Sequence, residues 1–163
     1  MAIPAPLDLY ASSVQPEWLD LNDHMNVAYF LLAFDQATDE LYRFVGVAED
    51  YMENRGHSMF TLVANTIYRR ELRRGDAIRI TTQILGFDAK KIHYIHHMYH
   101  GDEGYLAAAT EWLVIHVDMN ARRSAPFPDD IVARLTEIGD AHAALPVPPE
   151  VGRVISLGAG KPG

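Results

Sequence analysis

The sequence contains no cysteine among its 163 residues. Disulfides, thiolate metal sites and cysteine nucleophiles are therefore excluded, and the chain suits a reducing compartment such as the cytoplasm. No apolar run approaches the roughly 20 residues that a membrane-spanning helix needs. The first ten residues, MAIPAPLDLY, have neither a basic start nor a long apolar stretch, so a secretory signal is not expected. We therefore expect a cytoplasmic protein with no membrane partner.

Positive charge is also scarce, because 14 lysines and arginines oppose 22 acidic residues and the formal net charge is −8. A nucleic-acid partner requires a basic face, so no such partner is expected. The basic residues nevertheless gather in clusters, which either bind a small anion such as a phosphorylated cofactor or are solvated strand ends and turns. The clusters are Arg69, Arg70, Arg73 and Arg74; Lys90 and Lys91; and Arg122 and Arg123.

A long helix is predicted from Val27 to Gly46, where apolar residues recur every three or four positions. Further apolar residues lie beside this stripe, so the helix is expected to be covered on more than one side. Asn26 is the expected N-cap and Gly46 the expected end. A short second helix is predicted at residues 48–56 and a closing helix at residues 129–145.

The remaining pattern is rich in β-branched and aromatic residues, which is typical of strands. A first strand is predicted at residues 7–14, before the long helix. Four more strands follow it, separated by the turn signals RRGD, FDAK and GDEG, and their short connections predict an antiparallel meander. These four strands are expected at residues 58–72, 76–87, 90–100 and 104–119.

This order of elements predicts a single α+β domain over residues 1–145, in which an antiparallel five-stranded sheet wraps around one long central helix. A C-terminal helix at about 128–145 completes the domain. A flexible tail is expected at residues 146–163, which are rich in Pro and Gly. One such sheet leaves an edge exposed and its helix incompletely covered, so assembly into a homodimer or a dimer of dimers is expected.

Polar groups crowd into the stretch DLNDHMN, Asp20 to Asn26, immediately before the long helix. Asp and Asn are common helix caps, and this structural interpretation stays open. The alternative is chemistry, because a helix N-terminus offers free backbone N–H groups and a partial positive charge that can stabilise an oxyanion. The backbone amides near Met25 to Ala28 are the candidates for such an oxyanion hole.

The stretch DLNDHMNVAYF, together with the element order, resembles the hotdog-fold acyl-CoA thioesterases of the 4-hydroxybenzoyl-CoA thioesterase-like group. Their signature is an Asp, two variable residues, Gly-His, an apolar residue and Asn, followed by a Tyr inside the helix. Asp23 replaces the usual Gly, which adds a carboxylate and removes a flexible backbone position. The resemblance covers about residues 7–128. The residues that match are Asp20, His24, Met25, Asn26 and Tyr29.

The segments RRELRRGDAIRITTQIL and HVDMNARRSAPFP look most like the betainyl-CoA thioesterases associated with carnitine breakdown. The resemblance therefore implies hydrolysis of an acyl-CoA, with betainyl-CoA as a candidate substrate and coenzyme A as part of it rather than as a separate cofactor. In the family the active sites lie between subunits. Helix-entrance residues come from one subunit and strand residues from the other.

The resemblance also implies catalytic roles for three residues of the helix entrance. Asp20 would act as general base on water or attack the thioester directly, and both proposals exist for the family. His24 would orient water or hydrogen-bond the substrate. Asn26 would cap the helix, hold Asp20, or do both.

A betaine thioester carries a quaternary ammonium, and such cations bind favourably to aromatic faces. Aromatic residues at these spacings also fill cores, so both interpretations stay open. The candidates for substrate binding are Trp18, Asp23, Tyr29, Phe34, Tyr68 and Trp112. The phosphates of CoA would be held by Arg69, Arg70, Arg73, Arg74, Arg122 and Arg123.

The stretch HYIHHMYH contains four histidines but does not predict a metal site. Alternation along a strand places His93 and His97 on one face and His96 and His100 on the other, and no carboxylate accompanies them at ligand spacing. Two other functions compete with hydrolysis. One is a hotdog dehydratase, and the other is a non-catalytic module that binds or senses acyl-CoA and does not need Asp20.

Overall fold

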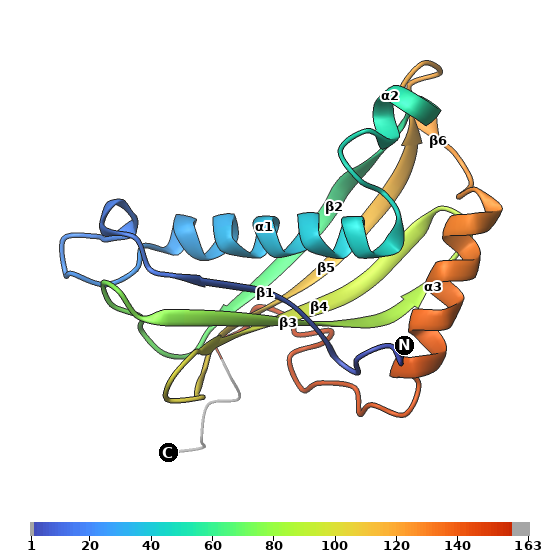
Figure 1. Cartoon of the computed structure of the whole chain (residues 1–163). Helices are drawn as coiled ribbons and strands as arrows, with labels where there is room; N and C mark the ends of the chain where they lie inside the picture. Colours follow the sequence, from blue (N-terminus) through green and yellow to red (C-terminus); the bar gives the residue numbers. More distant parts are fainter. Residues whose placement is uncertain (1, 158–163) are drawn as a thin grey trace.

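The computed structural model describes residues 2–157. The long helix α1 lies against a curved antiparallel sheet, and α3 packs at one end of it (Figure 1). The predicted α+β architecture of five long strands, a central helix and a C-terminal helix is confirmed. The elements are β1 (Leu7–Ser13), the 3-10 turn η1 (Pro16–Trp18), α1 (Val27–Val45), α2 (Tyr51–Arg55), β2 (His57–Tyr68), β3 (Ala77–Phe87), β4 (Lys91–His100), β5 (Leu106–Asp118), β6 (Arg123–Ser124) and α3 (Asp129–His142).

The strand order is β1-β3-β4-β5-β2, with the short β6 paired to the end of β5. The four strands after α1 were expected to form a meander in chain order. This prediction is wrong for β2, which pairs with β5 rather than with β3. The connection at 69–76 is not a hairpin turn. Leu72 in its middle is buried, and its carbonyl accepts a 2.7 Å hydrogen bond from the Met25 amide. The connection therefore crosses the end of the sheet and packs on the loop that precedes α1.

Helix α1 begins and ends where its sequence predicts. The Asn26 side chain accepts a hydrogen bond from the Ala28 amide at 2.9 Å, as an N-cap does. Gly46 ends the helix with φ 104°, a conformation that glycine adopts readily, and its amide bonds the last carbonyls. The buried face of the helix consists of Phe30, Ala33, Phe34, Ala37, Thr38, Leu41 and Val45.

A buried histidine joins α1 to the sheet. The two ring nitrogens of His96 contact Thr38 of α1 at 2.9 Å and Thr82 of β3 at 2.8 Å. Phe34 stacks on the same ring with centroids 6.0 Å apart. Burial lowers the pKa of His96 to about 3, so the ring is neutral at physiological pH.

Helix α3 packs against β3 and reaches the C-terminal end of α1. His142 in its last turn is buried and accepts a 2.9 Å hydrogen bond from the backbone amide of Ile84. Strand β1 pairs with β3 only as far as Leu7 opposite Thr82, so the histidine provides the acceptor that β1 no longer supplies. The sequence pattern predicted the helix but not this contact.

The segment after α3 forms no further helix or strand within the described residues. Part of it contacts the sheet, because Glu150 is buried and its carboxylate lies 3.2 Å from the Arg69 guanidinium. The flexibility expected from residue 146 onward stays a prediction, and residues 158–163 lie outside the described part of the chain. No helix within residues 2–157 is long and apolar enough to cross a membrane.

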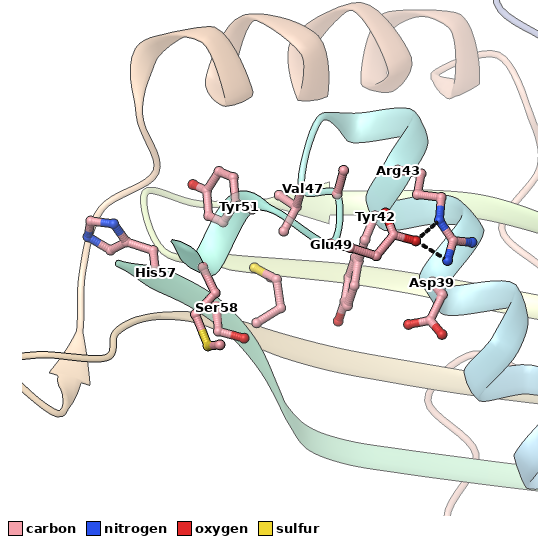
Figure 2. Close-up of a pocket in the computed structure, with 11 residues that line it drawn as sticks. Asp39, Tyr42, Arg43, Val47, Glu49, Tyr51, His57 and Ser58 are labelled. Atoms are coloured by element: carbon pink, nitrogen blue, oxygen red, sulfur yellow. Dashed lines mark hydrogen bonds and ion pairs between the residues drawn. The ribbon is translucent and has the colours of Figure 1, made fainter. Parts of the chain in front are cut away.

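Strand β2 forms one edge of the sheet and exposes apolar side chains along its middle. Phe60 is 48% exposed, Leu62 51% and Val63 52%. A cavity of about 350 Å³ opens where the start of β2 meets α2 and the C-terminal half of α1 (Figure 2). A second cavity, of about 450 Å³, opens at the other end of α1, beside the end of β2.

Candidate active site

The polar stretch before α1 folds into a tight loop. The Asp20 amide donates to the His24 carbonyl at 2.8 Å, and the Asp23 amide donates to the Asp20 carbonyl at 3.1 Å. Asp23 at the tip has φ 61°, a left-handed conformation. The related family usually has glycine at this position, and aspartate is among the few other residues that adopt this conformation readily. An aspartate at position 23 is therefore compatible with the left-handed turn at the tip of the loop.

The carboxylate of Asp20 is held by amides of its own loop. One oxygen accepts hydrogen bonds from the Asn22 amide at 2.8 Å and the His24 amide at 3.2 Å. These bonds, that of Asn22 first, lower the pKa of Asp20 below its usual value. The carboxylate is therefore ionised and fixed in direction at neutral pH.

Asp20 faces the cavity of about 450 Å³ at the N-terminus of α1. The cavity combines an apolar floor with charged groups at its mouth. Its lining residues are Asp20, Met25, Val27, Phe30, Tyr68, Arg69, Arg70 and Glu71.

Three of the four candidate oxyanion-hole amides are already hydrogen-bonded. The Met25 amide donates to the Leu72 carbonyl, the Asn26 amide to the Trp18 carbonyl and the Ala28 amide to the Asn26 side chain. Within residues 2–157 the Val27 amide has no acceptor. Val27 is the first residue of α1 and lines the Asp20 cavity, so its N–H is the donor that remains for a substrate oxygen.

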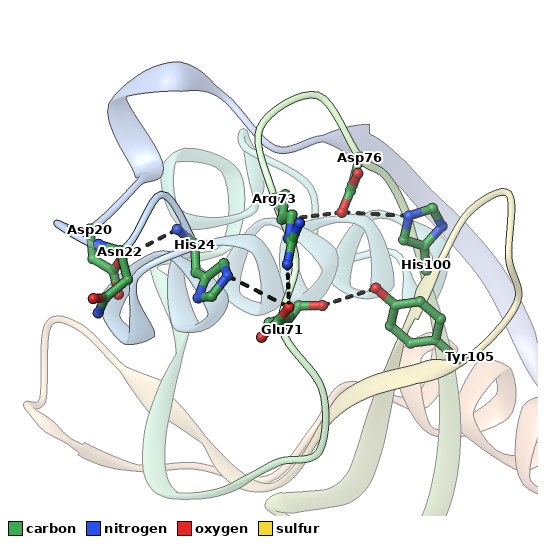
Figure 3. Close-up of polar contacts among 8 residues, drawn as sticks. All are labelled: Asp20, Asn22, His24, Glu71, Arg73, Asp76, His100 and Tyr105. Atoms are coloured by element: carbon green, nitrogen blue, oxygen red, sulfur yellow. Dashed lines mark hydrogen bonds and ion pairs between the residues drawn. The ribbon is translucent and has the colours of Figure 1, made fainter.

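The other two catalytic candidates lie beside Asp20. His24 is half-buried, and its ring lies 3.6 Å from the Glu71 carboxylate, which also accepts a 2.8 Å hydrogen bond from Arg73 (Figure 3). These two neighbours, Arg73 first, hold the pKa of Glu71 below its usual value. Asn26 caps the helix and makes no side-chain hydrogen bond to Asp20 within the described residues.

The aromatic candidates for substrate binding are distributed between the cavity and the core. Tyr68 is 46% exposed and lines the Asp20 cavity. Trp18 and Tyr29 stack on each other at 5.9 Å, and Trp18 is buried. Phe34 and Trp112 are buried beneath α1 in the core. Of these candidates, only Tyr68 meets the cavity of its own chain.

Asp23, the remaining substrate-binding candidate, lies away from the cavity. Its side chain is 76% exposed and lies 3.6 Å from Arg74.

The arginines of the first basic cluster surround the mouth of the site, and most of them are already paired. Arg69 contacts Glu150 at 3.2 Å, and Arg73 contacts Glu71. The guanidinium of Arg70 lies 3.6 Å from the centre of the Tyr105 ring. Each of these three cations therefore has a partner within its own chain.

The cluster of Arg122 and Arg123 lies at the opposite end of the sheet. Arg123 pairs with Asp118 at the end of β5, whereas the Arg69 amide bonds Ala107 at its start. Thirteen residues of β5 separate these ends, a span of about 40 Å. Arg122 and Arg123 therefore cannot reach the Asp20 cavity of their own chain.

A network of polar side chains beside the site was not predicted from the sequence. Tyr105 donates to the Glu71 carbonyl at 2.9 Å, and His100 lies 3.5 Å from Asp76, which accepts from the Arg73 amide at 2.8 Å (Figure 3). It surrounds a cavity of about 490 Å³ next to the Asp20 cavity. Only the GDEG turn signal between His100 and Tyr105 indicated that these two residues share one end of the sheet.

The histidines of β4 are divided between the two faces of the sheet, as their alternation predicted. His96 contacts Thr38 of α1, whereas His97 on the other face contacts Glu150 at 3.4 Å. Each therefore has its own partner on its own side of the sheet.

Known protein families and sequences include relatives of this chain. A family model for the thioesterase-like superfamily matches residues 14–135. The chain belongs to this superfamily. It is 40% identical over 151 residues to a betainyl-CoA thioesterase of Pseudomonas aeruginosa, covering 93% of this chain and 95% of that one. It is 34% identical over 148 residues to an L-carnitine dehydrogenase/betainyl-CoA thioesterase of Rhizobium meliloti, covering 91% of this chain and 30% of that longer protein.

Solved structures of this thioesterase-like fold are similar along almost the whole chain. A putative thioesterase from Pseudomonas putida KT2440 superposes with a TM-score of 0.83 at 34% identity, covering 96% of this chain and 99% of that one. A Staphylococcus aureus protein in complex with CoA has a TM-score of 0.87 at 24% identity, covering 94% and 98%. The second likeness establishes the hotdog fold, in agreement with the curled sheet around α1.

Proposed function

We propose that this thioesterase-like protein hydrolyses acyl-CoA esters, with betainyl-CoA as its substrate and betaine and CoA as its products, in the breakdown of carnitine. The observation that carries the proposal is the pairing of Asp20, an oriented and ionised carboxylate, with the free Val27 amide in one cavity. The 40% identity to a betainyl-CoA thioesterase supports the choice of acyl group. The proposed location is the cytoplasm, because a chain without cysteine needs no oxidising compartment.

In the proposed reaction the thioester oxygen accepts a hydrogen bond from the Val27 amide, whose position at the positive end of α1 stabilises the developing oxyanion. Asp20 removes a proton from water, and the resulting hydroxide adds to the thioester carbon. The tetrahedral intermediate then expels the CoA thiolate, which takes up a proton. Alternatively, the Asp20 carboxylate attacks the carbon itself, and water hydrolyses the mixed anhydride.

The two routes differ in where water oxygen appears. A single turnover in H₂¹⁸O labels the acid product directly if Asp20 acts as a base. If Asp20 attacks the thioester, hydrolysis of the anhydride at the aspartyl carbon places the label in the enzyme. Label found by mass spectrometry in the peptide that contains Asp20 therefore identifies the nucleophilic route, whereas opening of the anhydride at the acyl carbon would label only the acid.

The basic residues provide the proposed contacts to the phosphates of CoA. Arg69 and Arg70 line the Asp20 cavity, and Arg73 lies in the adjoining one. Arginine suits this role because its planar guanidinium binds phosphate through two parallel hydrogen bonds. Arg74 at the loop tip, and Arg122 and Arg123 of a partner subunit, complete the proposed set.

Self-association through β2 is part of the proposal. An edge strand presents unpaired backbone groups, and β2 adds exposed Phe60, Leu62 and Val63 to them. A second copy can continue the sheet by antiparallel pairing about a two-fold axis, so that the same surface meets itself. With the axis between Leu62 and Val63, Tyr68 lies opposite the partner's His57. Such pairing also brings the partner's end of β5, with its arginines, toward the Asp20 site.

The experiment that tests the function is a thiol-release assay with a panel of acyl-CoA esters. The panel contains betainyl-CoA beside short, branched and aromatic esters. We expect release of free CoA, fastest from betainyl-CoA. Binding of the esters without release of thiol would instead identify a non-catalytic module, and hydration of an enoyl-CoA without release would identify a dehydratase.

A further inference from the structure

The cavity at the C-terminal end of α1 contains acidic and aromatic groups that the proposed chemistry at Asp20 does not use. It has a volume of about 350 Å³ and lies between α1, α2 and the start of β2 (Figure 2). Carboxylates, phenol rings and thioethers converge on it. The residues that matter here are Asp39, Tyr42, Glu49, Tyr51, Met52 and Met59.

The carboxylates around this cavity exceed the positive charge available to them. Arg43 bonds both Glu40 and Glu49, so its charge is already shared. Asp39 has no ion pair or hydrogen bond from its side chain within residues 2–157. Asp35 lies one turn earlier on α1, and burial together with the charge of Asp39 raises its pKa. Arg43 also lines the cavity, but Glu40, Glu49 and the nearby Asp39 share its single charge, so the described carboxylates outnumber the cations around this site.

The rings and thioethers around Asp39 determine which kind of cation fits. Tyr42 extends into the cavity beside Asp39, and Tyr51 lies on the opposite side of it (Figure 2). Aromatic faces and polarisable sulfur favour a cation with a methylated, weakly hydrated surface over a small hydrated metal ion. A quaternary ammonium has this chemistry.

This cavity is too far along α1 to serve Asp20 of its own chain. Asp39 follows Val27 by twelve residues, which is about 18 Å along a helix. In a betainyl group only one methylene separates the thioester carbon from the quaternary nitrogen. A single subunit therefore cannot hold the carbonyl at Val27 and the ammonium at Asp39 together.

Pairing of β2 with β2 of a second subunit brings the two kinds of cavity together. Tyr68 at one end of the strand lines the Asp20 cavity, and His57 to Met59 at the other end line the acidic cavity. Antiparallel pairing of two identical strands about a two-fold axis matches one end of each strand with the opposite end of its partner. The acidic cavity of one subunit is then next to the Asp20 cavity of the other.

We propose that the cavity at Asp39 and Tyr42 binds the positively charged head of the acyl group, and that it serves Asp20 of the partner subunit. Asp39 is the counter-ion and the Tyr42 ring is one wall. This assignment rests on the proposed thioesterase function and on the two-fold pairing of β2. It makes Asp39 a specificity-determining residue that the helix-entrance motif does not contain.

Two esters of equal shape test the charge recognition. Betainyl-CoA and 3,3-dimethylbutyryl-CoA differ only in a quaternary nitrogen in place of a quaternary carbon. For Asp39→Asn we expect kcat/KM to fall at least tenfold on betainyl-CoA and to stay within twofold on the neutral ester. The matched control Asp140→Asn, an exposed acid on α3, is expected to change neither value. An equal loss on both esters, or no loss on either, overturns the cation pocket.

Mixed dimers test whether the pocket acts across subunits. Asp20→Asn and Asp39→Asn chains with different affinity tags are co-expressed, and the heterodimer is purified through both tags. If the site is shared, one of its two sites carries both substitutions and the other carries neither. The heterodimer is then expected to recover about half of the wild-type betainyl-CoA activity. Activity no higher than the mean of the two parent variants overturns the assignment to the partner.

A binding measurement separates failure of this inference from failure of the proposed function. Broadening of the trimethyl proton NMR signal reports binding of glycine betaine and requires no hydrolysis. We expect wild type to bind it at least fivefold more tightly than Asp39→Asn does. Such a difference supports the pocket even if no ester in the panel releases CoA, whereas equal binding by the two proteins overturns it.

Discussion

At the scale of single residues, the loop before α1 both orients Asp20 and limits its basicity. Two backbone amides bind the same carboxylate oxygen, which leaves the other oxygen free to face the cavity. The amides lower the pKa of Asp20, so the carboxylate is already ionised at neutral pH. The lower pKa also makes it a weaker base. In the proposed mechanism its chemistry therefore depends on position, next to the Val27 amide that would stabilise the oxyanion.

The Val27 amide can be removed without disturbing the helix. Val27→Pro places proline at the first helical position, where its fixed φ is favourable and its missing N–H breaks no hydrogen bond of the helix. Asn26 before it already has ψ 145°, the extended conformation that a following proline requires. We expect kcat for thioester hydrolysis to fall about 10²–10³-fold, the typical cost of one lost oxyanion donor.

The matched control for this substitution is Val27→Ala, which shortens the side chain and keeps the amide. We expect it to retain kcat within a few-fold, and both variants to unfold at the wild-type temperature. If the proline variant hydrolyses thioesters as fast as the alanine variant, the Val27 amide is not the oxyanion donor.

The sequence named the candidate residues of the helix entrance but not which of their groups are available to a substrate. Asp20, His24 and Asn26 could be named because their spacing resembles a family signature. The role of Val27 depends on which amides are already bonded, and those bonds come from Leu72 and Trp18 elsewhere in the chain. The same limit applies to Trp112, whose aromatic character says nothing about whether it faces a cavity or the core.

At the scale of elements, α1 is positioned by packing and by one buried polar contact. Its apolar face fills the concave side of the sheet, and His96 joins Thr38 of the helix to Thr82 of β3. This contact requires a neutral imidazole, because a buried imidazolium would lack a compensating charge. The packing of α1 on the sheet therefore includes a contact to a group that titrates.

The His96 contact makes stability sensitive to acid. The pKa of His96 is about 3 in the fold and about 6.5 in an unfolded chain, so the unfolded state binds the extra proton first as the pH falls. The contribution of neutral His96 to the stability of the fold is complete above about pH 6.5 and is lost progressively toward pH 3. We expect this residue alone to reduce the free energy of unfolding by about 2 kcal/mol between pH 7 and pH 5.

Urea unfolding of wild type and His96→Gln at several pH values measures this contribution. Glutamine keeps donor and acceptor groups but does not titrate in this range. The difference between the two unfolding free energies is expected to shrink by about 2 kcal/mol from pH 7 to pH 5. Two curves that stay parallel over this range would exclude His96 as the sensitive group.

Local periodicity was sufficient to predict the elements and insufficient to predict how β2 pairs. The helical spacing of α1 and the alternation in β3, β4 and β5 are properties of each segment alone. The pairing of β2 with β5 depends on the crossing of residues 69–76, which is anchored by the buried Leu72. A turn signal such as RRGD marks a change of direction but not the strand that the chain meets next.

At the scale of the whole molecule, the described chain has two cavities at opposite ends of α1 and an exposed edge between them. The Asp20 cavity and the acidic cavity both border β2, and exposed apolar residues lie along the middle of that strand. Self-association was expected from the open edge alone. Which residues meet across it could not be predicted from sequence, because it depends on the register between two copies.

Charges placed on the β2 edge test this assembly. In Leu62→Lys/Val63→Lys, two exposed apolar residues become cations, and each of them lies opposite a new cation of the partner across the two-fold axis. We expect light scattering after gel filtration to show a monomer, and kcat/KM on betainyl-CoA to fall at least tenfold because the site is shared. Val147→Lys, an exposed apolar position outside β2, is expected to leave assembly and activity unchanged. A fully active monomer would contradict the shared site.

The central claim is that the Asp20 carboxylate performs the chemistry at the N-terminus of α1, and the single-turnover rate of Asp20→Asn tests it most directly. Asparagine keeps the oxygen that accepts the Asn22 and His24 amides, so the loop and the affinity for the ester are expected to be preserved. The account predicts that the rate of thiol release from bound betainyl-CoA falls about 10²–10⁴-fold, with an unchanged unfolding temperature. A rate within a few-fold of wild type would contradict it.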